Sequence, residues 1–227
     1  MLNVNAGFLP NVNWTEIGQA TLETLYIVFS STILGYLLGL PMGVALTVTD
    51  KDGIAPNRVV YKVLDVVINI LRSAPFIILL IIVIPFTRLI VGKSYGPTAT
   101  VVPLVIAASP FIARMVESSL KEVDHGVVEA AQSLGAGNLT IIWKVLLAEA
   151  RTSLLTGLTI AFATILGYSA MAGAIGGGGL GALAINYGYY RYKTDVMVIT
   201  LIILILLVQV FQWAGMKLAR ALDRRNR

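Results

Sequence analysis

The stretch TLYIVFSSTILGYLLGLPMGVALTVT, from Thr24 to Thr49, decides the fold class. Its 26 residues include no Asp, Glu, Lys or Arg. As an α-helix it would measure about 39 Å, which exceeds the ~30 Å thickness of the hydrocarbon core of a bilayer. A single charge at the centre of such a helix would cost about 2.5–3.5 kcal/mol. The stretch therefore predicts a transmembrane helix.

The composition of the whole chain supports a membrane protein. Of its 227 residues, 57% are hydrophobic and 13% are charged, and the mean hydropathy is +0.82. These values leave no room for a soluble catalytic domain, so we expect no enzyme activity in this chain. It has no Cys and a single His, His125, so thiolate metal sites are excluded and no metal or cofactor is expected. No Lys or Arg precedes Lys51, so we expect no cleaved signal peptide and expect the first span to stay in the membrane.

Charge-poor runs predict four further spans. They are Val66–Thr87, Ser94–Ala113, Thr152–Tyr190 and Val196–Met216. Pro75 and Pro85 are expected to kink or end the helix in the first of these runs, which also contains Arg72. The third is too long for one span and too short for two, and its glycine content predicts that the helix ends near Ala172. We expect one all-α, polytopic domain over residues 1–227, with spans at about 22–48, 64–87, 95–115, 152–173 and 196–218.

The distribution of Lys and Arg predicts the orientation. One side of a five-span chain collects 12 basic residues and the other side collects 4, with Arg72 assigned to neither. Because basic loops stay in the cytoplasm, the N-terminus is expected outside and the C-terminus inside. The 12 are Lys51, Arg58, Lys62, Arg114, Lys121, Lys144, Arg151, Lys217, Arg220, Arg224, Arg225 and Arg227, and the 4 are Arg88, Lys93, Arg191 and Lys193.

The longest polar connection, at about 116–150, then lies in the cytoplasm. Its segment DHGVVEAAQSLG predicts a short helix that Asp124 caps, with Glu129 in an early turn and Gly135 in the left-handed conformation after the last turn. A second helix is expected from Asn138, with Ile141, Ile142, Val145 and Leu146 on one apolar side. The simplest interpretation is a helical hairpin that lies on the lipid surface.

A second interpretation comes from a resemblance. Glu129, Ala130 and Ala131, followed by Gly135 and by Val145–Leu147, resemble the EAA loop of ATP-binding-cassette (ABC) importer permeases. In that family the loop docks onto the ATPase subunit, which assigns coupling to Glu129, Ala130, Ala131, Leu134 and Gly135. The family commonly ends the motif with proline, where this chain has Ala148, so the geometry at the start of the fourth span is expected to differ.

Four more segments resemble the methionine importer permeases of that family. They are RSAPFIILL from Arg72, IPFTRLIVG from Ile84, SPFIARMVE from Ser109 and GYSAMAGAIGGGGLG from Gly167. The resemblance implies the type I importer architecture in the bacterial cytoplasmic membrane and a homodimer of five-span subunits. It also implies two cytoplasmic ATPases that bind ATP and Mg²⁺, and an extracytoplasmic binding protein that delivers methionine (D or L).

Three further groups of residues in the spans are candidates for a functional or structural role. Because the resemblance places the pathway in the fourth span, Tyr168, Ser169 and Met171 are candidate gate residues, with plain core packing as the alternative for Met171. Gly35, Gly39 and Gly43 recur every four residues on one face of the first span and predict close helix packing, within the subunit or across a dimer. Asp65 and Arg72, seven residues apart, are expected to form an ion pair.

Other motifs and functions carry less weight. TRLIVGKS, at Thr87–Ser94, has the end of a phosphate-binding loop but lacks its first glycine, and Gly176, Gly178 and Gly181 follow a span and not a strand. Nucleotide binding by this chain is therefore not expected.

The alternatives to a methionine importer permease are a permease for another amino acid or a small peptide, an ion-gradient-driven transporter, and a membrane scaffold without transport activity. Five spans do not divide into inverted repeats, which argues against the gradient-driven transporter.

Overall fold

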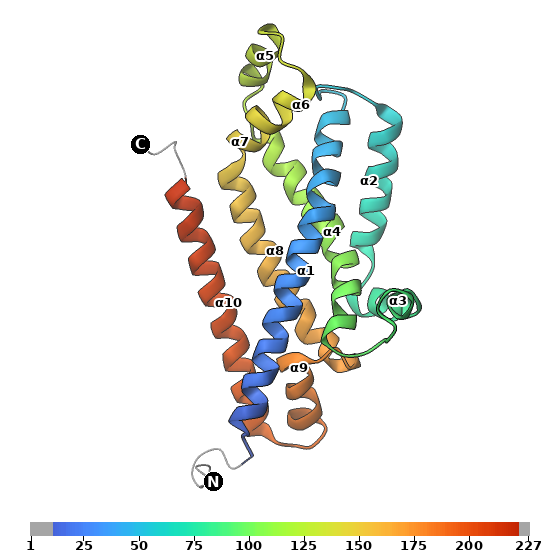
Figure 1. The fold of residues 1–227 in the computed structure, drawn as a ribbon, viewed down its shortest axis with the longest axis vertical. Helices are drawn as coiled ribbons and strands as arrows, with labels where there is room; N and C mark the ends of the chain where they lie inside the picture. The colour runs from blue at the N-terminus through green and yellow to red at the C-terminus, as the bar shows by residue number, and fades with distance from the viewer. Residues whose placement is uncertain (1–10, 223–227) are drawn as a thin grey trace. The chain divides into compact units, whose positions relative to one another are not determined.

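The computed structural model describes residues 11–222, and all regular secondary structure in that range is helical (Figure 1). The chain divides into two compact units. The first comprises the residues up to Ile33, Pro75–Ile106 and Phe162–Phe211, and the second comprises Leu34–Ala74, Ala107–Ala161 and the residues from Gln212 onward. Each boundary except the one at Ala74 falls inside a long helix, so four helices contribute residues to both units.

The helices follow one another along the chain with short connections. The α-helices of the described residues are α1 (Trp14–Thr49), α2 (Arg58–Ser73), α3 (Phe76–Val91), α4 (Pro97–Lys121), α5 (His125–Ser133), α6 (Asn138–Ile141), α7 (Leu147–Glu149), α8 (Arg151–Ala172), α9 (Gly179–Leu183) and α10 (Thr194–Leu222). A π-helical turn (Ile142–Leu146) joins α6 to α7. A 3-10 turn (Gly173–Ile175) follows α8, and a second π-helical segment (Ala184–Tyr189) follows α9.

Four of the described helices are long and apolar enough to cross a membrane, namely α1, α4, α8 with its 3-10 turn, and α10. The broken pair of α2 and α3 raises the number to five if it is counted as one span. The expected all-α, polytopic fold class is confirmed. The helices extend beyond the charge-poor runs, because α1 begins at Trp14 and α4 continues to Lys121.

The break between α2 and α3 lies at Pro75. Ala74 has an extended backbone with a ψ of 129°, as the residue before a proline prefers, and α3 begins directly after the proline. Pro85 lies inside α3 and does not end it. Of the two prolines expected to kink or end this span, Pro75 therefore ends a helix and Pro85 does not.

The glycine-rich segment after α8 turns the chain and then becomes helical again. The end of α8 at Ala172 confirms the expected position. Gly176, Gly178 and Gly179 have φ values of 82°, 81° and 71°, which glycine adopts without strain. The backbone N–H of Gly179 donates to the Glu23 carboxylate at 2.8 Å. This contact fixes the start of α9 against α1 within the first unit.

In the second unit, glycines bring α1 and α4 into close contact. A Cβ at Gly39 would lie 2.7 Å from the carbonyl oxygen of Ser109, and a Cβ at Gly43 would lie 2.5 Å from that of Ala113. At Gly35 the nearest atom is the Cδ1 of Ile112, at 3.0 Å. The glycine stripe thus packs within the subunit, against the face of α4.

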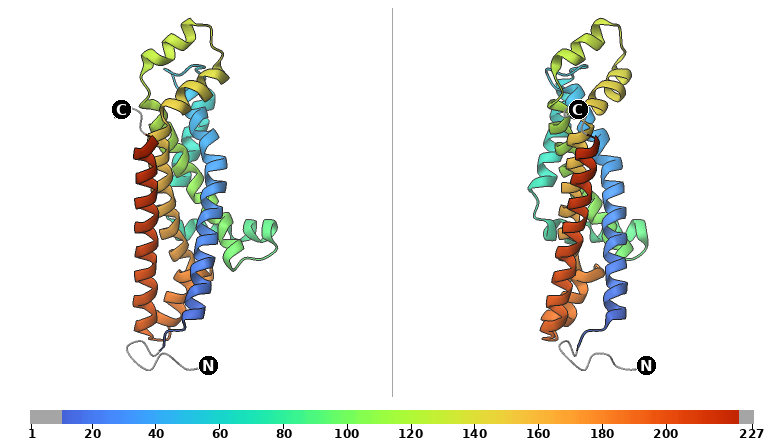
Figure 2. Two further views of the ribbon diagram at one scale, coloured as in Figure 1. Left: turned by 60° about the vertical axis from the view of Figure 1, so that its left-hand side comes forward. Right: turned by 90° about the vertical axis from the view of Figure 1, so that its left-hand side faces the viewer.

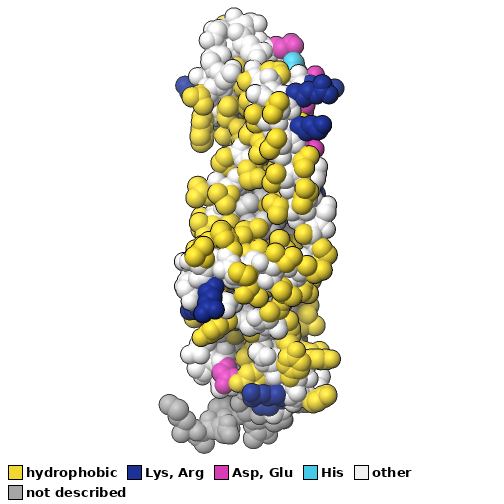
Figure 3. Space-filling view, turned by 90° about the vertical axis from the view of Figure 1, so that its right-hand side faces the viewer, with side chains coloured by type: hydrophobic (Ala, Val, Ile, Leu, Met, Phe, Trp, Pro, Cys, Tyr) yellow, Lys and Arg dark blue, Asp and Glu magenta, His cyan; other side chains and the backbone are white. Residues whose placement is uncertain are grey.

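The surface of the described chain is largely apolar, as a membrane protein requires. Hydrophobic side chains cover most of the face shown in Figure 3. In the most apolar 18-residue stretch of α10 only 11% of the residues are buried, compared with 67% in the corresponding stretch of α4. We infer that α4 is a core helix and that α10 turns most of its side chains to lipid or to another subunit.

Replacing Gly43 by alanine tests the close contact between α1 and α4. We expect Gly43→Ala to lower the melting temperature of the purified protein, because overpacking costs roughly 1–3 kcal/mol. Gly18→Ala is the control, since a Cβ there meets no atom within 4 Å in the same helix. It should keep or raise the melting temperature, because alanine favours a helix by about 1 kcal/mol over glycine. Equal melting temperatures for the two variants would contradict the packing.

Candidate functional site

The candidate site is the helical hairpin of α5 and α6, which connects α4 to α8 within the second unit (Figure 2). Asp124 caps α5, because its Oδ1 accepts a hydrogen bond from the backbone N–H of Gly126 at 2.7 Å. At the other end Gly135 has a φ of 78°. The N–H of Gly135 donates to Gln132 at 2.9 Å and that of Ala136 to Ala131 at 3.1 Å, which is a Schellman motif. The expected cap, helix and glycine turn are confirmed.

Glu129 lies later in the helix than the sequence suggested. Because α5 begins at His125, Glu129 is in the second turn, where the helix dipole has little effect. Its Oε1 lies 3.0 Å from the Nδ1 of His125, and about two thirds of each side chain is exposed. The carboxylate of Glu129 is therefore available to a partner protein.

The other residues assigned to coupling also lie at the surface. Ala130 and Gly135 are exposed, Ala131 is half-buried, and Leu134 is 88% exposed. Val128 of the same helix is buried and anchors α5 to the protein. The hairpin thus presents small and apolar groups outward.

Two more exposed apolar side chains lie on the hairpin, and the sequence reasoning did not single them out. Leu139 in α6 is 73% exposed, and Trp143 in the π-helical turn is 66% exposed. Of the expected apolar side, Ile141 and Leu146 are buried, whereas Ile142 and Val145 are half-buried. The π-helical turn explains this, since its wider spacing places residues five apart on the same side.

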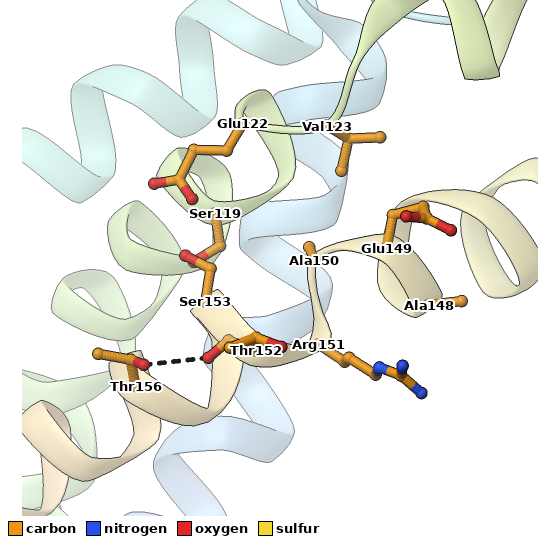
Figure 4. A pocket seen from close by; sticks show the side chains of 10 residues that line it. All are labelled: Ser119, Glu122, Val123, Ala148, Glu149, Ala150, Arg151, Thr152, Ser153 and Thr156. Atoms are coloured by element: carbon orange, nitrogen blue, oxygen red, sulfur yellow. Dashed lines mark hydrogen bonds between the residues drawn. The ribbon is translucent and has the colours of Figure 1, made fainter. Parts of the chain in front are cut away.

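A polar cavity of about 420 Å³ lies where the hairpin joins α4 and α8, and Ala148 forms part of its wall (Figure 4). The Oγ of Ser153 donates to the Oγ of Ser119 at 2.9 Å, which links α8 to α4. The hydroxyl of Thr156 donates a hydrogen bond to the backbone carbonyl of Thr152 at 3.0 Å. The lining residues are Ser119, Glu122, Val123, Ala148, Glu149, Ala150, Arg151, Thr152, Ser153 and Thr156.

Ion pairs link α4 to its neighbours beside the hairpin. Asp65 pairs with Arg114 of α4, and the expected pair of Asp65 with Arg72 is wrong. The Nζ of Lys121 lies 2.7 Å from the Oδ2 of Asp50, and this bond is the main cause of the lowered pKa of the Asp50 carboxyl. Because that pKa is lowered, the pair stabilises the fold above the ordinary carboxyl pKa and loses its contribution only as the pH falls through the lowered value.

The three gate candidates in α8 do not share one environment. Tyr168 stacks on Phe76 with ring centroids 4.4 Å apart, and Met171, three residues later, is half-exposed. Ser169 is buried, and its hydroxyl donates to the carbonyl of Leu166 at 2.8 Å. Tyr168 is half-buried against Phe76 and Met171 is exposed, whereas Ser169 bonds to its own helix.

The Thr87–Ser94 segment does not have the form of a phosphate-binding loop. The helix that contains Thr87 ends at Val91, and Gly92 caps its C-terminal end with a φ of 80°, whereas phosphate loops lead into a helix N-terminus. Within residues 11–222, no group of three or more His, Asp or Glu side chains could hold a metal ion.

Comparisons with known proteins identify the family. Residues 21–227 match the family described as binding-protein-dependent transport system inner membrane component. A probable D-methionine transport system permease protein of Pasteurella multocida is 48% identical over 93% of this chain and 98% of that protein. The methionine import system permease protein of Bacillus subtilis is 41% identical, over 96% of this chain and 98% of that protein.

A solved structure gives the same answer at the level of the fold. The inward-facing MetNI methionine ABC transporter contains a chain that matches with a TM-score of 0.92 and 45% identity, over 93% of this chain and 98% of that chain. The chain described here belongs to the family of binding-protein-dependent transport system inner membrane components.

Proposed function

We propose that this chain is the membrane-spanning permease subunit of an ATP-driven ABC importer and that the imported substrate is methionine. The hairpin of α5 and α6 carries the proposal, because it is capped at both ends and exposes Glu129, Ala130 and Leu134. The relatives that match over nearly the whole chain are methionine transport permeases, which supports the choice of substrate.

The assembly follows from the same argument. Two copies of this chain form the pathway, two cytoplasmic ATPase subunits bind ATP and Mg²⁺, and an extracytoplasmic binding protein delivers the substrate. The apolar, poorly buried surface of α10 suits lipid or a neighbouring subunit. This chain is a transport subunit and catalyses no reaction.

The hairpin transmits the work of ATP hydrolysis. Closure of the ATPase pair displaces α5, and the spans reorient between outward-open and inward-open states. To move such an equilibrium from 1:99 to 99:1 requires about 5.5 kcal/mol of differential binding. This energy crosses the contact between α5 and the ATPase. Ala130 and Ala131 keep α5 thin enough to enter a groove there, and Gly135 allows the sharp turn at its end.

The orientation can be tested by labelling single introduced cysteines, because the chain has no native Cys. Labels near the termini, at Asn5 and Asn226, would test it directly, but these two residues lie outside the described range, as do the basic residues Arg224, Arg225 and Arg227. Two described residues are therefore used. We expect Tyr95→Cys, in the connection between α3 and α4, to react with an impermeant thiol reagent in intact cells. Lys51→Cys should react only after the membrane is opened, and labelling of both in intact cells would contradict the proposed topology.

Glu129→Lys tests the coupling role. We expect normal insertion with loss of ATPase co-purification, or ATP hydrolysis without uptake, because the lysine reverses a charge at the proposed contact. Asp52→Lys is the matched control, since Asp52 is an exposed acidic residue of the same unit outside the hairpin. If α5 only lies on anionic lipid, the added lysine should be tolerated or should strengthen membrane contact. Unchanged uptake and co-purification in Glu129→Lys would contradict coupling.

Met171→Cys tests the pathway assignment, in which Tyr168, Ser169 and Met171 lie on or beside the axis of the dimer. We expect the cysteines of two copies to crosslink, and the yield to change with nucleotide. Ile205→Cys is the control, because this α10 residue has a similar exposure, 51% compared with 49% for Met171. A Met171→Cys protein that neither crosslinks nor reacts with a water-soluble thiol reagent in any nucleotide state would place Met171 in an ordinary core.

A further inference from the structure

Glu117 of α4 is the only charged residue that is buried in the described part of the chain, with 3% of its side chain exposed. Two cations of the same helix neutralise it. The Nη1 of Arg114 lies 2.7 Å from its Oε2, and the Nζ of Lys121 lies 2.8 Å from its Oε1. A buried carboxylate needs such partners, because an unpaired charge in the interior is strongly destabilising.

Each of these cations also binds a different neighbour of α4. Arg114 pairs with Asp65 of α2 and donates to the Oδ1 of Asn69 at 3.0 Å. Lys121 pairs with Asp50, the residue after α1, at 2.7 Å. We call the set of Asp50, Asp65, Asn69, Arg114, Glu117 and Lys121 the Glu117 network. It joins the end of α1, the middle of α2 and the end of α4 through one carboxylate.

The Glu117 network lies where the chain leaves α4 and enters the hairpin, a place that we call the root of the hairpin. Lys121 is the last residue of α4, and α5 begins four residues later at His125. A cavity of about 460 Å³ is lined by Asp50, Lys121, His125 and Val128 among other residues. All these residues belong to the second unit, which contains the hairpin as well.

Packing already holds α1, α2 and α4 together without the charges. The glycine stripe brings α1 against α4, and Leu46, Ile68 and Ala113 form a buried cluster that joins α1, α2 and α4. An ionic network around one buried carboxylate adds little net stability beyond such packing, but it can fix the register of the elements that it joins. Any slide of α4 along α1 or α2 would separate Arg114 or Lys121 from an acidic partner.

We propose that Glu117 is a positioning residue that fixes the root of the hairpin to α1 and α2, so that a displacement of α5 by the ATPase moves α1, α2 and α4 as one body. The inference rests on the proposed function as an ATP-driven importer. It assigns to the Glu117 network the task of passing on a movement, in addition to any contribution to the fold. Because α1 and α4 continue into the first unit, this movement reaches the residues there through unbroken helices.

The first test uses Glu117→Gln in the complete complex, reconstituted with its ATPase and binding protein in lipid vesicles. We expect the number of substrate molecules imported per ATP hydrolysed to fall by about fivefold or more, the range of typical coupling effects. ATPase co-purification should not change, because the surface of α5 is intact. A normal ratio in a folded Glu117→Gln complex would overturn the proposal.

The second test replaces one ion pair of the network by a covalent link, which keeps the proposal falsifiable if Glu117→Gln does not fold. Asp50→Cys with Lys121→Cys should lower the import ratio by a similar factor. A short reducible crosslinker that joins the two thiols should restore it, and reduction should abolish the gain. If crosslinking raises the melting temperature but leaves the ratio low, the network contributes only to the fold.

The neighbouring pair Lys51 and Asp52 is the matched control. Their charged atoms lie 3.6 Å apart, but both side chains are highly exposed and lie outside the Glu117 network. Lys51→Cys with Asp52→Cys should keep the wild-type ratio with and without the crosslinker. No ATP-driven uptake by the wild-type complex would contradict the proposed function, whereas unchanged ratios in variants of an active complex would contradict only the role of Glu117.

Discussion

The close approach of α1 to α4 determines the structure of the second unit. At Gly39 and Gly43 a side chain would meet the backbone of α4, so only hydrogen atoms separate the two helices at these points. With the two helices this close, Leu46 reaches a buried cluster with Ala113 and Ile68, and Asp50 reaches Lys121. A wider spacing would leave Lys121 without its α1 partner. Small residues are the usual means of such packing in lipid, where no hydrophobic effect drives helices together.

The positions of the long helices were predictable from charge-poor runs, but the end of α4 was not. The run that predicts α4 stops at Ala113, whereas the helix continues for two more turns to Lys121. Arg114, Glu117 and Lys121 recur at the three- and four-residue spacings that allow ion pairs on one helix face. Because these three charges neutralise one another, the helix continues through them to Lys121. The spacing was visible in the sequence, but its meaning depended on recognising a buried carboxylate.

Contacts between distant residues could not be predicted. Asp65 has Arg72 two turns away on its own helix, yet it pairs with Arg114 of another helix. No local pattern distinguishes these two arginines, because the choice depends on how α2 and α4 pack. Likewise, Tyr168 and Ser169 are neighbours in a motif, but one stacks on Phe76 and the other bonds to its own helix. By contrast, the cap of α5 and the turn at Gly135 are local features and were correctly predicted.

Gly43 and Gly135 are the same residue type under opposite constraints. Gly43 has an ordinary helical backbone but no space for a Cβ, whereas Gly135 has a φ of 78° and no atom within 4 Å of the place where a Cβ would lie. At the first position every larger side chain, alanine included, therefore costs overpacking against α4. The second excludes only side chains that resist the left-handed conformation, and asparagine adopts it more readily than most residues. Natural variation at Gly135 should accordingly favour asparagine, aspartate or histidine, whereas every substitution at Gly43 should weaken the contact between α1 and α4.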